Sequence, residues 1–285
     1  MSTADTLGSL EQALTAIEQY RAANSPVSGD LDLHLALLRL VADREARMRP
    51  PELTAPPLAD QPLLRSLALE VDWNEAVALA GTVLEVLRQH RPDLIEYLGP
   101  VSTLLSQAES FAAVATPFLD GHALPLPEAR ATMALESGAL LQFVVLYALR
   151  PTLRAYAAAL ASVDFEKWQR GTCPVCGGLP DFAALVQKPE GGRVLLCSRC
   201  DTEWTFPRVA CPFCGNVDSA QQGYYPVGED QVYRLYTCEH CHGYLKTVDA
   251  RAAAHPLPLT AERVLTIELD GEAARSGYRS PLAPL

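Results

Sequence analysis

The chain has 285 residues, of which 49% are hydrophobic, and this is enough to bury a core in more than one structural unit. Its formal net charge of −11 disfavours nucleic acid and anionic lipid as partners, because like charges repel. No apolar stretch reaches the ~20 residues that a membrane span requires. The first residues lack the basic and apolar regions of a signal peptide, so we expect a cytoplasmic protein without membrane insertion.

Helical periodicity dominates residues 1–165. Apolar side chains recur every three or four positions there, as on one buried face of a helix, first over residues 7–17 and then over residues 33–41. Most of the negative charge of the chain also falls in this region. The sequence therefore predicts an acidic all-helical domain, a bundle of roughly six helices.

Several helix ends are marked by particular residues. Asp72 and Glu75 have the spacing of a capping box and predict a helix from Trp73 to about His90. Pro92 suits the first position of the helix that follows.

A stretch rich in Pro and Gly, from Thr116 to Pro127, is expected to be a loop. The Ala- and Leu-rich segment 128–161 after it is expected to be helical, with a break or kink caused by Pro151 near Arg150.

The composition changes at residues 164–170, where Gly, Pro and aromatic residues replace the Ala-rich runs. Short alternating runs that predict strands occur at 193–196, 203–206, 233–236 and 244–247. Each lies beside a Cys-x-x-Cys pair, and strand, cysteine turn and strand is the outline of a zinc ribbon or a rubredoxin.

The expected fold is therefore multidomain, α plus small β. An all-helical bundle over residues 1–165 is followed by two tandem rubredoxin-like or zinc-ribbon modules. We expect these modules at 166–210 and at 211–285, the second with a C-terminal tail.

All eight cysteines belong to four Cys-x-x-Cys pairs. In each pair a tight turn points two sulfurs at one position, and two such turns complete a tetrahedral metal site. The pattern Cys-Pro-x-Cys-Gly followed by a second pair occurs twice, which predicts two sequential four-cysteine sites. The candidate ligands are Cys173, Cys176, Cys197 and Cys200 in the first site, and Cys211, Cys214, Cys238 and Cys241 in the second.

Other interpretations of the cysteines remain open. The two middle pairs could form one site and leave the two outer pairs for the other. Thioredoxin-like redox chemistry would need a pair at the start of a helix in a βαβ unit. A reducing compartment favours metal ligation over disulfides, and four thiolates suit both zinc and iron, of which zinc is the commoner ion in such sites.

Other residues near the cysteines have simpler expected roles. His240 and His242 flank Cys241 and could replace a ligand, but are expected to face solvent. Trp204 is expected to anchor the thin core of a small metal module, with contact to a partner protein as the alternative. We find no set of acid, base and nucleophile and no phosphate-binding loop, so we do not expect an enzyme.

Four motifs are more specific than cysteine pairs in general. They are Cys-Pro-Val-Cys-Gly-Gly (173–178), Cys-Ser-Arg-Cys-Asp-Thr-Glu-Trp (197–204), Cys-Pro-Phe-Cys-Gly (211–215) and Cys-Glu-His-Cys-His-Gly-Tyr-Leu-Lys (238–246). The most distinctive residues are Glu203-Trp204 and Tyr244-Leu245-Lys246 within these motifs, and Arg208 ahead of the third motif. Residues 173–246 thereby resemble the FdhE family of formate dehydrogenase accessory proteins, while the helical region agrees with that family in size and order only.

The resemblance implies a cytoplasmic maturation factor and not a dehydrogenase. Its expected partner is the catalytic subunit of a respiratory formate dehydrogenase, which such proteins assist before export. The family's cysteine knuckles are regarded as rubredoxin-like and iron-binding. The resemblance therefore implies ligand roles for all eight cysteines and favours iron over zinc as the cofactor.

Two other functions compete with this expectation. A rubredoxin-like electron carrier would use the same cysteines, although a large helical domain is an unusual attachment for it. A zinc-ribbon scaffold that binds nucleic acid would need a basic face, whereas residues 166–285 carry more acidic than basic side chains.

Overall fold

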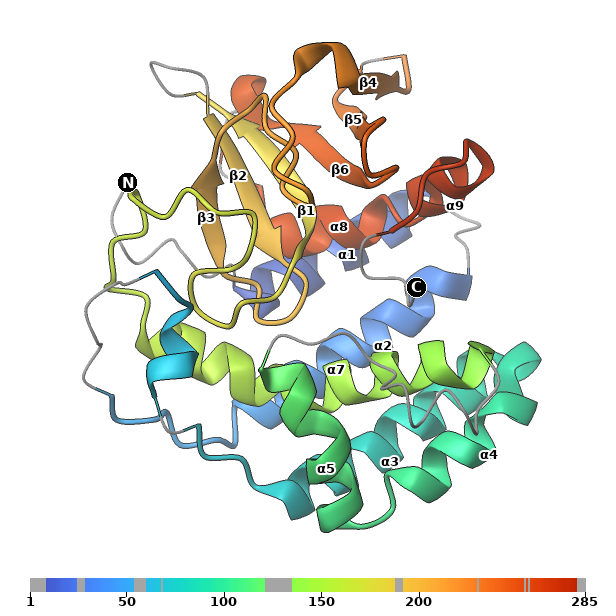
Figure 1. Cartoon of the computed structure of the whole chain (residues 1–285). Helices are drawn as coiled ribbons and strands as arrows, with labels where there is room; N and C mark the ends of the chain where they lie inside the picture. Colours follow the sequence, from blue (N-terminus) through green and yellow to red (C-terminus); the bar gives the residue numbers. More distant parts are fainter. Residues whose placement is uncertain are drawn as a thin grey trace.

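The computed structural model describes residues 9–24, 29–53, 60–67, 69–120, 135–187, 192–229, 231–253, 255 and 257–280. Two lobes pack on each other (Figure 1). We call the helices that precede residue 160 the helical lobe, and the strands and helices from residue 173 onward the sheet lobe.

The helical lobe contains six α-helices among the described residues. They are α1 (Leu10–Ala23), α2 (Gly29–Glu45), α3 (Trp73–His90), α4 (Ile95–Leu104), α5 (Ala108–Leu119) and α7 (Leu135–Ala159). Helix α7 is central and packs against α2, α3 and α4 (Figure 1). The prediction of an N-terminal helical region is confirmed.

Helix α3 begins and ends where the sequence predicts. A carboxylate oxygen of Asp72 accepts hydrogen bonds from the backbone N–H groups of Asn74 and Glu75, each 3.1 Å long, and so caps the first turn. After α3, a short 3-10 turn over Pro92–Leu94 leads directly into α4. Pro92 fits there because the first turn of a helix leaves its backbone N–H groups unbonded anyway.

Of the break or kink expected at Pro151, the break does not occur, since α7 continues through this residue to Ala159. A proline inside a helix costs about 3 kcal/mol. Leu149 and Leu153 on either side of Pro151 are almost completely buried. Fully burying an aliphatic side chain contributes about 1.5–3 kcal/mol, so tertiary packing is able to offset the local cost.

Helix α5 also extends further than expected. It continues through Pro117 to Leu119, so the loop expected from Thr116 begins later. Residues 121–134 lie outside the described residues, and with them the remainder of that loop and the expected helix start at residue 128.

Six strands form one sheet in the order β3-β2-β1-β6-β5-β4. They are β1 (Pro180–Val186), β2 (Gly192–Cys197), β3 (Glu203–Phe206), β4 (Gln222–Val227), β5 (Tyr233–Cys238) and β6 (Tyr244–Asp249). All neighbours are antiparallel except β1 and β6, which pair in parallel with Phe182 opposite Lys246. Each cysteine module thus supplies three strands, and the two modules join at the β1–β6 pair.

The segment after β6, expected as a tail, contains α8 (Leu259–Leu265) and α9 (Glu268–Arg275). Helix α8 contacts β1 of the sheet and also α1 and α2 of the helical lobe. It therefore lies between the two lobes, while α9 packs against β6 (Figure 1).

The largest cluster of buried apolar side chains spans both lobes. It includes Leu37 of α2, Val83 of α3 and Val145 of α7 together with Cys176 and Trp204 of the sheet lobe. The helical lobe and the first cysteine module therefore share one core. No helix in the described part of the chain is long and apolar enough to cross a membrane.

Candidate metal centres

The first cluster is built by the turn before β1 and the turn between β2 and β3. The sulfurs of Cys173, Cys176, Cys197 and Cys200 all lie within 4.8 Å of one another. The Sγ atoms of Cys173 and Cys200 are 3.6 Å apart, and those of Cys176 and Cys197 are 3.4 Å apart.

The second cluster repeats this arrangement with the turn before β4 and the turn between β5 and β6. It contains Cys211, Cys214, Cys238 and Cys241, whose sulfurs also lie within 4.8 Å of one another. Two Sγ pairs, Cys211 with Cys241 and Cys214 with Cys238, are 3.7 Å apart. The cysteines are grouped in sequential order, and not by joining the two middle pairs.

The turns owe their shape to glycine and to backbone hydrogen bonds. Gly177 and Gly215 have φ values of +76° and +73°, a region that residues with a Cβ rarely enter. The N–H of Gly177 donates to the carbonyl of Cys173, and that of Gly215 to the carbonyl of Cys211, both at 3.0 Å. Each turn is thereby closed with its two sulfurs on the same side.

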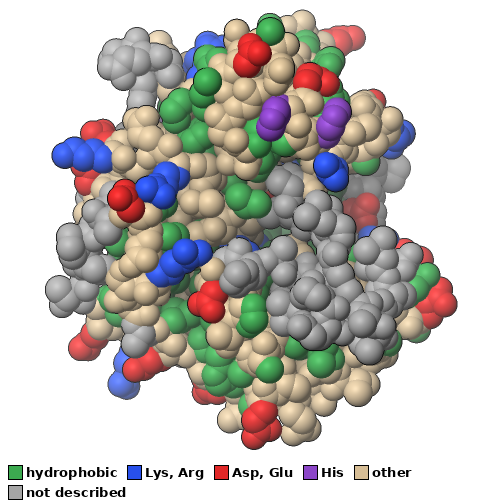
Figure 2. Space-filling model, in the orientation of Figure 1, with side chains coloured by type: hydrophobic (Ala, Val, Ile, Leu, Met, Phe, Trp, Pro, Cys, Tyr) green, Lys and Arg blue, Asp and Glu red, His purple; other side chains and the backbone are tan. Residues whose placement is uncertain are grey.

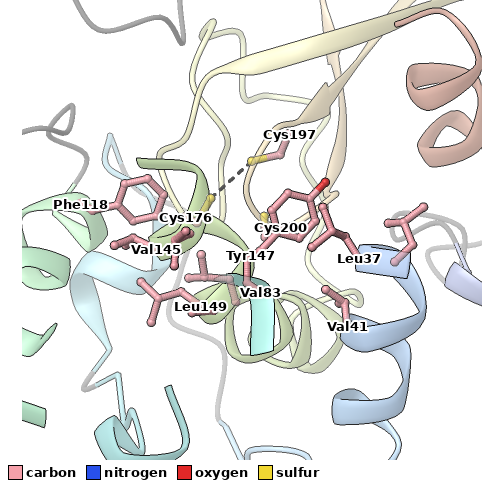
Figure 3. Close-up of a cluster of buried hydrophobic side chains, with 14 of the residues drawn as sticks. Leu37, Val41, Val83, Phe118, Val145, Tyr147, Leu149, Cys176, Cys197 and Cys200 are labelled. Atoms are coloured by element: carbon pink, nitrogen blue, oxygen red, sulfur yellow. Dashed lines mark hydrogen bonds between the residues drawn. The ribbon is translucent and has the colours of Figure 1, made fainter. Parts of the chain in front are cut away.

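The two clusters differ in exposure. All four cysteines of the first are buried, and Cys176, Cys197 and Cys200 lie among side chains of the helical lobe such as Phe118 and Val145 (Figure 3). In the second, Cys214 is exposed and Cys241 is half-buried. The first cluster belongs to the shared core, whereas the second lies at the surface.

Electrostatics also distinguish the clusters. Burial raises the pKa of the Cys173 thiol well above its ordinary value, because a thiolate is poorly solvated in the core. Burial has the same effect on Cys238, but backbone N–H groups of Cys241 and His240 outweigh it and lower its pKa to about 7. A bound cation would compensate thiolate charge at both places. Four sulfurs in this arrangement fit zinc or iron.

The histidines and Trp204 lie where the simpler expectations put them. His240 and His242 are exposed, and neither joins the four sulfurs of the second cluster. Trp204 is only 2% exposed, and its indole N–H donates to the carbonyl of Arg170 at 2.9 Å. It is therefore a buried anchor and not a surface for a partner, whereas Arg208 is exposed.

Sequence reasoning missed one functional feature, a buried ion cluster beside the first cysteines. The carboxylate of Asp201, directly after Cys200, pairs with Arg150, with Arg154 at 2.5 Å and with Arg263 at 3.0 Å. Arg150 and Arg154 are four residues apart on one helix, which was the available signal. Nothing in the sequence indicated that α8 would bring a third arginine.

A helical lobe joined to two zinc-ribbon-like four-cysteine modules is the class of protein that this fold and these clusters define. A sequence model described as FdhE, central domain, matches residues 172–208, which contain the first cluster. An FdhE homologue from Pseudomonas aeruginosa is 29% identical over 298 residues, covering 96% of this chain and 83% of that protein. These matches confirm the resemblance to the FdhE family seen in the cysteine motifs.

Other relatives match over shorter ranges. An FdhE homologue from Aquifex aeolicus is 32% identical over 141 residues, which are 49% of this chain and 49% of the relative. The chain thus spans about half the length of this relative. The crystal structure of the FdhE protein from Pseudomonas aeruginosa has a TM-score of 0.55 at 24% identity, covering 96% of this chain and 94% of that one, and shares the fold.

Proposed function

We propose that this protein is a non-catalytic accessory protein that binds the catalytic subunit of a formate dehydrogenase during its assembly or activation. Similarity to FdhE proteins supports an accessory role. The observation that carries the proposal is the pair of four-cysteine clusters. Four thiolates around one metal ion leave no position for water, so such a site can stabilise a module or exchange an electron but cannot activate water.

In this proposal all eight cysteines are metal ligands, and iron is favoured over zinc. The donor set suits both ions, and the preference for iron rests on the family resemblance. Iron, when bound, supplies a one-electron couple, whereas zinc supplies structure alone.

The two clusters have different parts in the proposal. The first, buried in the core that both lobes share, holds the lobes together. The second has an exposed Cys214, so the partner subunit can approach its metal ion. We therefore assign the partner-facing role to the second module.

Co-purification tests the proposed partner. The tagged protein is isolated without oxygen from its native host during growth on formate, and the proteins that accompany it are identified by mass spectrometry. We expect the catalytic subunit of formate dehydrogenase with the unchanged protein, and its loss with Cys211→Ser/Cys214→Ser. His240→Ala, an exposed change in the same module, is the matched control and should retain the partner. Recovery of nucleic acid or of a reductase in place of that subunit would contradict the proposal.

Absorption spectroscopy tests the metal. Protein isolated without oxygen is expected to contain close to two iron ions per chain, one for each cluster. In the ferric state it should show visible sulfur-to-iron charge-transfer bands that disappear reversibly on reduction. Colourless protein containing two equivalents of zinc would leave the accessory role standing and remove the redox one.

A rubredoxin-like electron carrier is the second candidate, because Cys214 exposes one cluster to an electron donor. Rapid reduction by a reductase without any stable complex with formate dehydrogenase would favour it. Nucleic-acid binding has less support. On the face drawn in Figure 2, basic and acidic side chains of the described residues are intermixed, and the chain is strongly acidic.

A further inference from the structure

A cavity of about 290 Å³ lies between the two lobes. Its helical side includes His34 of α2 and Tyr147 of α7, and its opposite side includes Tyr244 and Lys246 of β6 and Arg263 of α8. This volume is at the lower end of the range for ligand pockets, which often form where two structural units meet.

The charged lining of the cavity has an excess of cations. Arg150, Lys246 and Arg263 are all buried, and the carboxylates that face them are Asp181 and Asp270. Lys246 donates to Asp270 at 2.7 Å, and Arg263 donates to Asp181 at 3.3 Å. Behind this wall the carboxylate of Asp201 is shared by Arg150, Arg154 and Arg263. Arg154 also pairs with Glu45 at 2.6 Å, so the excess of cations is confined to the lining itself.

Arg150 has a donor that is unsatisfied within the described part of the chain. Its Nη1 donates to the carbonyl of Ser198 at 3.2 Å and its Nη2 donates to Asp201. Its Nε is buried and has no hydrogen-bond partner among the described residues. A buried donor without an acceptor is unfavourable, and an acceptor inside the cavity would satisfy it.

The pKa of His34 depends on the burial and the charges around the cavity. Its Nδ1 lies 3.3 Å from the hydroxyl oxygen of Tyr147. Burial, followed by the charges of Arg263, Lys246 and Arg150, lowers the pKa of His34 to about 4. The imidazole is therefore neutral at pH 7. Burial would disfavour an anion as well, whereas the smaller effect of the three cations would favour one.

The remaining lining contains Ser198 and Ser280 and four apolar side chains. These four are Phe143 and Leu146 of α7, Val264 of α8 and Ile267 just after α8. We propose that this cavity binds a carboxylate carried on a short apolar group, with Arg150 Nε as a donor to the carboxylate and these four side chains around the apolar part. Charge-assisted hydrogen bonds from a guanidinium to a carboxylate are strong and directional.

The proposal does not depend on the accessory role. The carboxylate could belong to a free organic acid or to the C-terminal residue of a peptide, and the two sources share the same chemistry.

Calorimetric titration of the full-length, metal-loaded protein tests the proposal. The probes are 4-methylpentanoate for a free acid and N-acetyl-leucine for a peptide C-terminus, each compared with its neutral amide. We expect at least one carboxylate to bind and its amide to bind roughly tenfold more weakly or worse, as expected for loss of a charged acceptor. The carboxylate that binds more tightly identifies the source.

Two variants locate the binding site. Leu146→Trp should fill the cavity and abolish binding without removing a polar group, whereas Leu104→Trp, at a half-buried position of α4 outside the cavity, should not. Arg150→Lys removes the Nε donor and should weaken binding at least tenfold where circular dichroism shows it folded. Equal binding of acid and amide, no binding of either acid at millimolar concentration, or full binding to Leu146→Trp would each overturn the proposal.

Discussion

Asp201 connects the first cysteine cluster to the helices. It is completely buried, and its φ of 57° turns the chain sharply after Cys200. Burial alone would raise the pKa of its carboxyl group, but Arg150, Arg263 and Arg154 outweigh this effect and hold the pKa well below its usual range. The carboxylate therefore stays charged and links α7 and α8 to the cysteine turn.

Replacing Asp201 by Asn keeps the volume and removes the charge. Three buried guanidinium groups then lose a shared partner, and breaking a buried pair in this way costs about 3–5 kcal/mol. We expect urea denaturation of metal-loaded Asp201→Asn to show a loss of that size in the free energy of unfolding.

The control for this change is Asp93→Asn, which removes an exposed carboxylate paired with Arg91. Solvent screens such a pair, so its unfolding midpoint should stay close to that of the unchanged protein. Equal effects of the two substitutions would show that the Asp201 cluster contributes nothing beyond a surface ion pair.

At the scale of elements, capping residues and alternation in the sequence correctly predicted one helix start and four strands. The cap at Asp72 fixed the start of α3, and alternation marked β2, β3, β5 and β6. Strand β1 was missed because it is buried along most of its length and reads as an apolar run without alternation. Strand β4 was missed because it contains Gly223 and Pro226, which an edge strand tolerates.

The errors at prolines and at the C-terminus share one cause. Continuation of α7 through Pro151, and the docking of α8 between the lobes, depend on surfaces that are distant in sequence. The cavity between the lobes arises in the same way, since His34, Tyr147 and Lys246 meet only after the lobes pack. By contrast, the grouping of the eight cysteines could be predicted, because each turn is local and the pattern repeats.

At the scale of the whole molecule, the two clusters differ in burial. They should therefore differ in how much of the structure must open before a bound metal ion can leave. A metal ion in the first cluster would be enclosed by the core that joins the lobes, so its release requires much of the structure to open. A metal ion in the second cluster would be reachable through the exposed Cys214, after local opening of one turn. Global unfolding is far rarer than local opening in a stable protein.

A chelator should therefore remove the two metal ions in two separate phases. With excess chromogenic chelator, we expect one equivalent to leave quickly while the helical circular dichroism at 222 nm stays constant, and the second to leave only as that signal falls. Cys214→Ser should abolish or accelerate the fast phase and leave the slow phase unchanged, and His240→Ala should alter neither. A single phase for both equivalents, or a loss of helix with the first, would mean that the second cluster is as deeply coupled to the fold as the first.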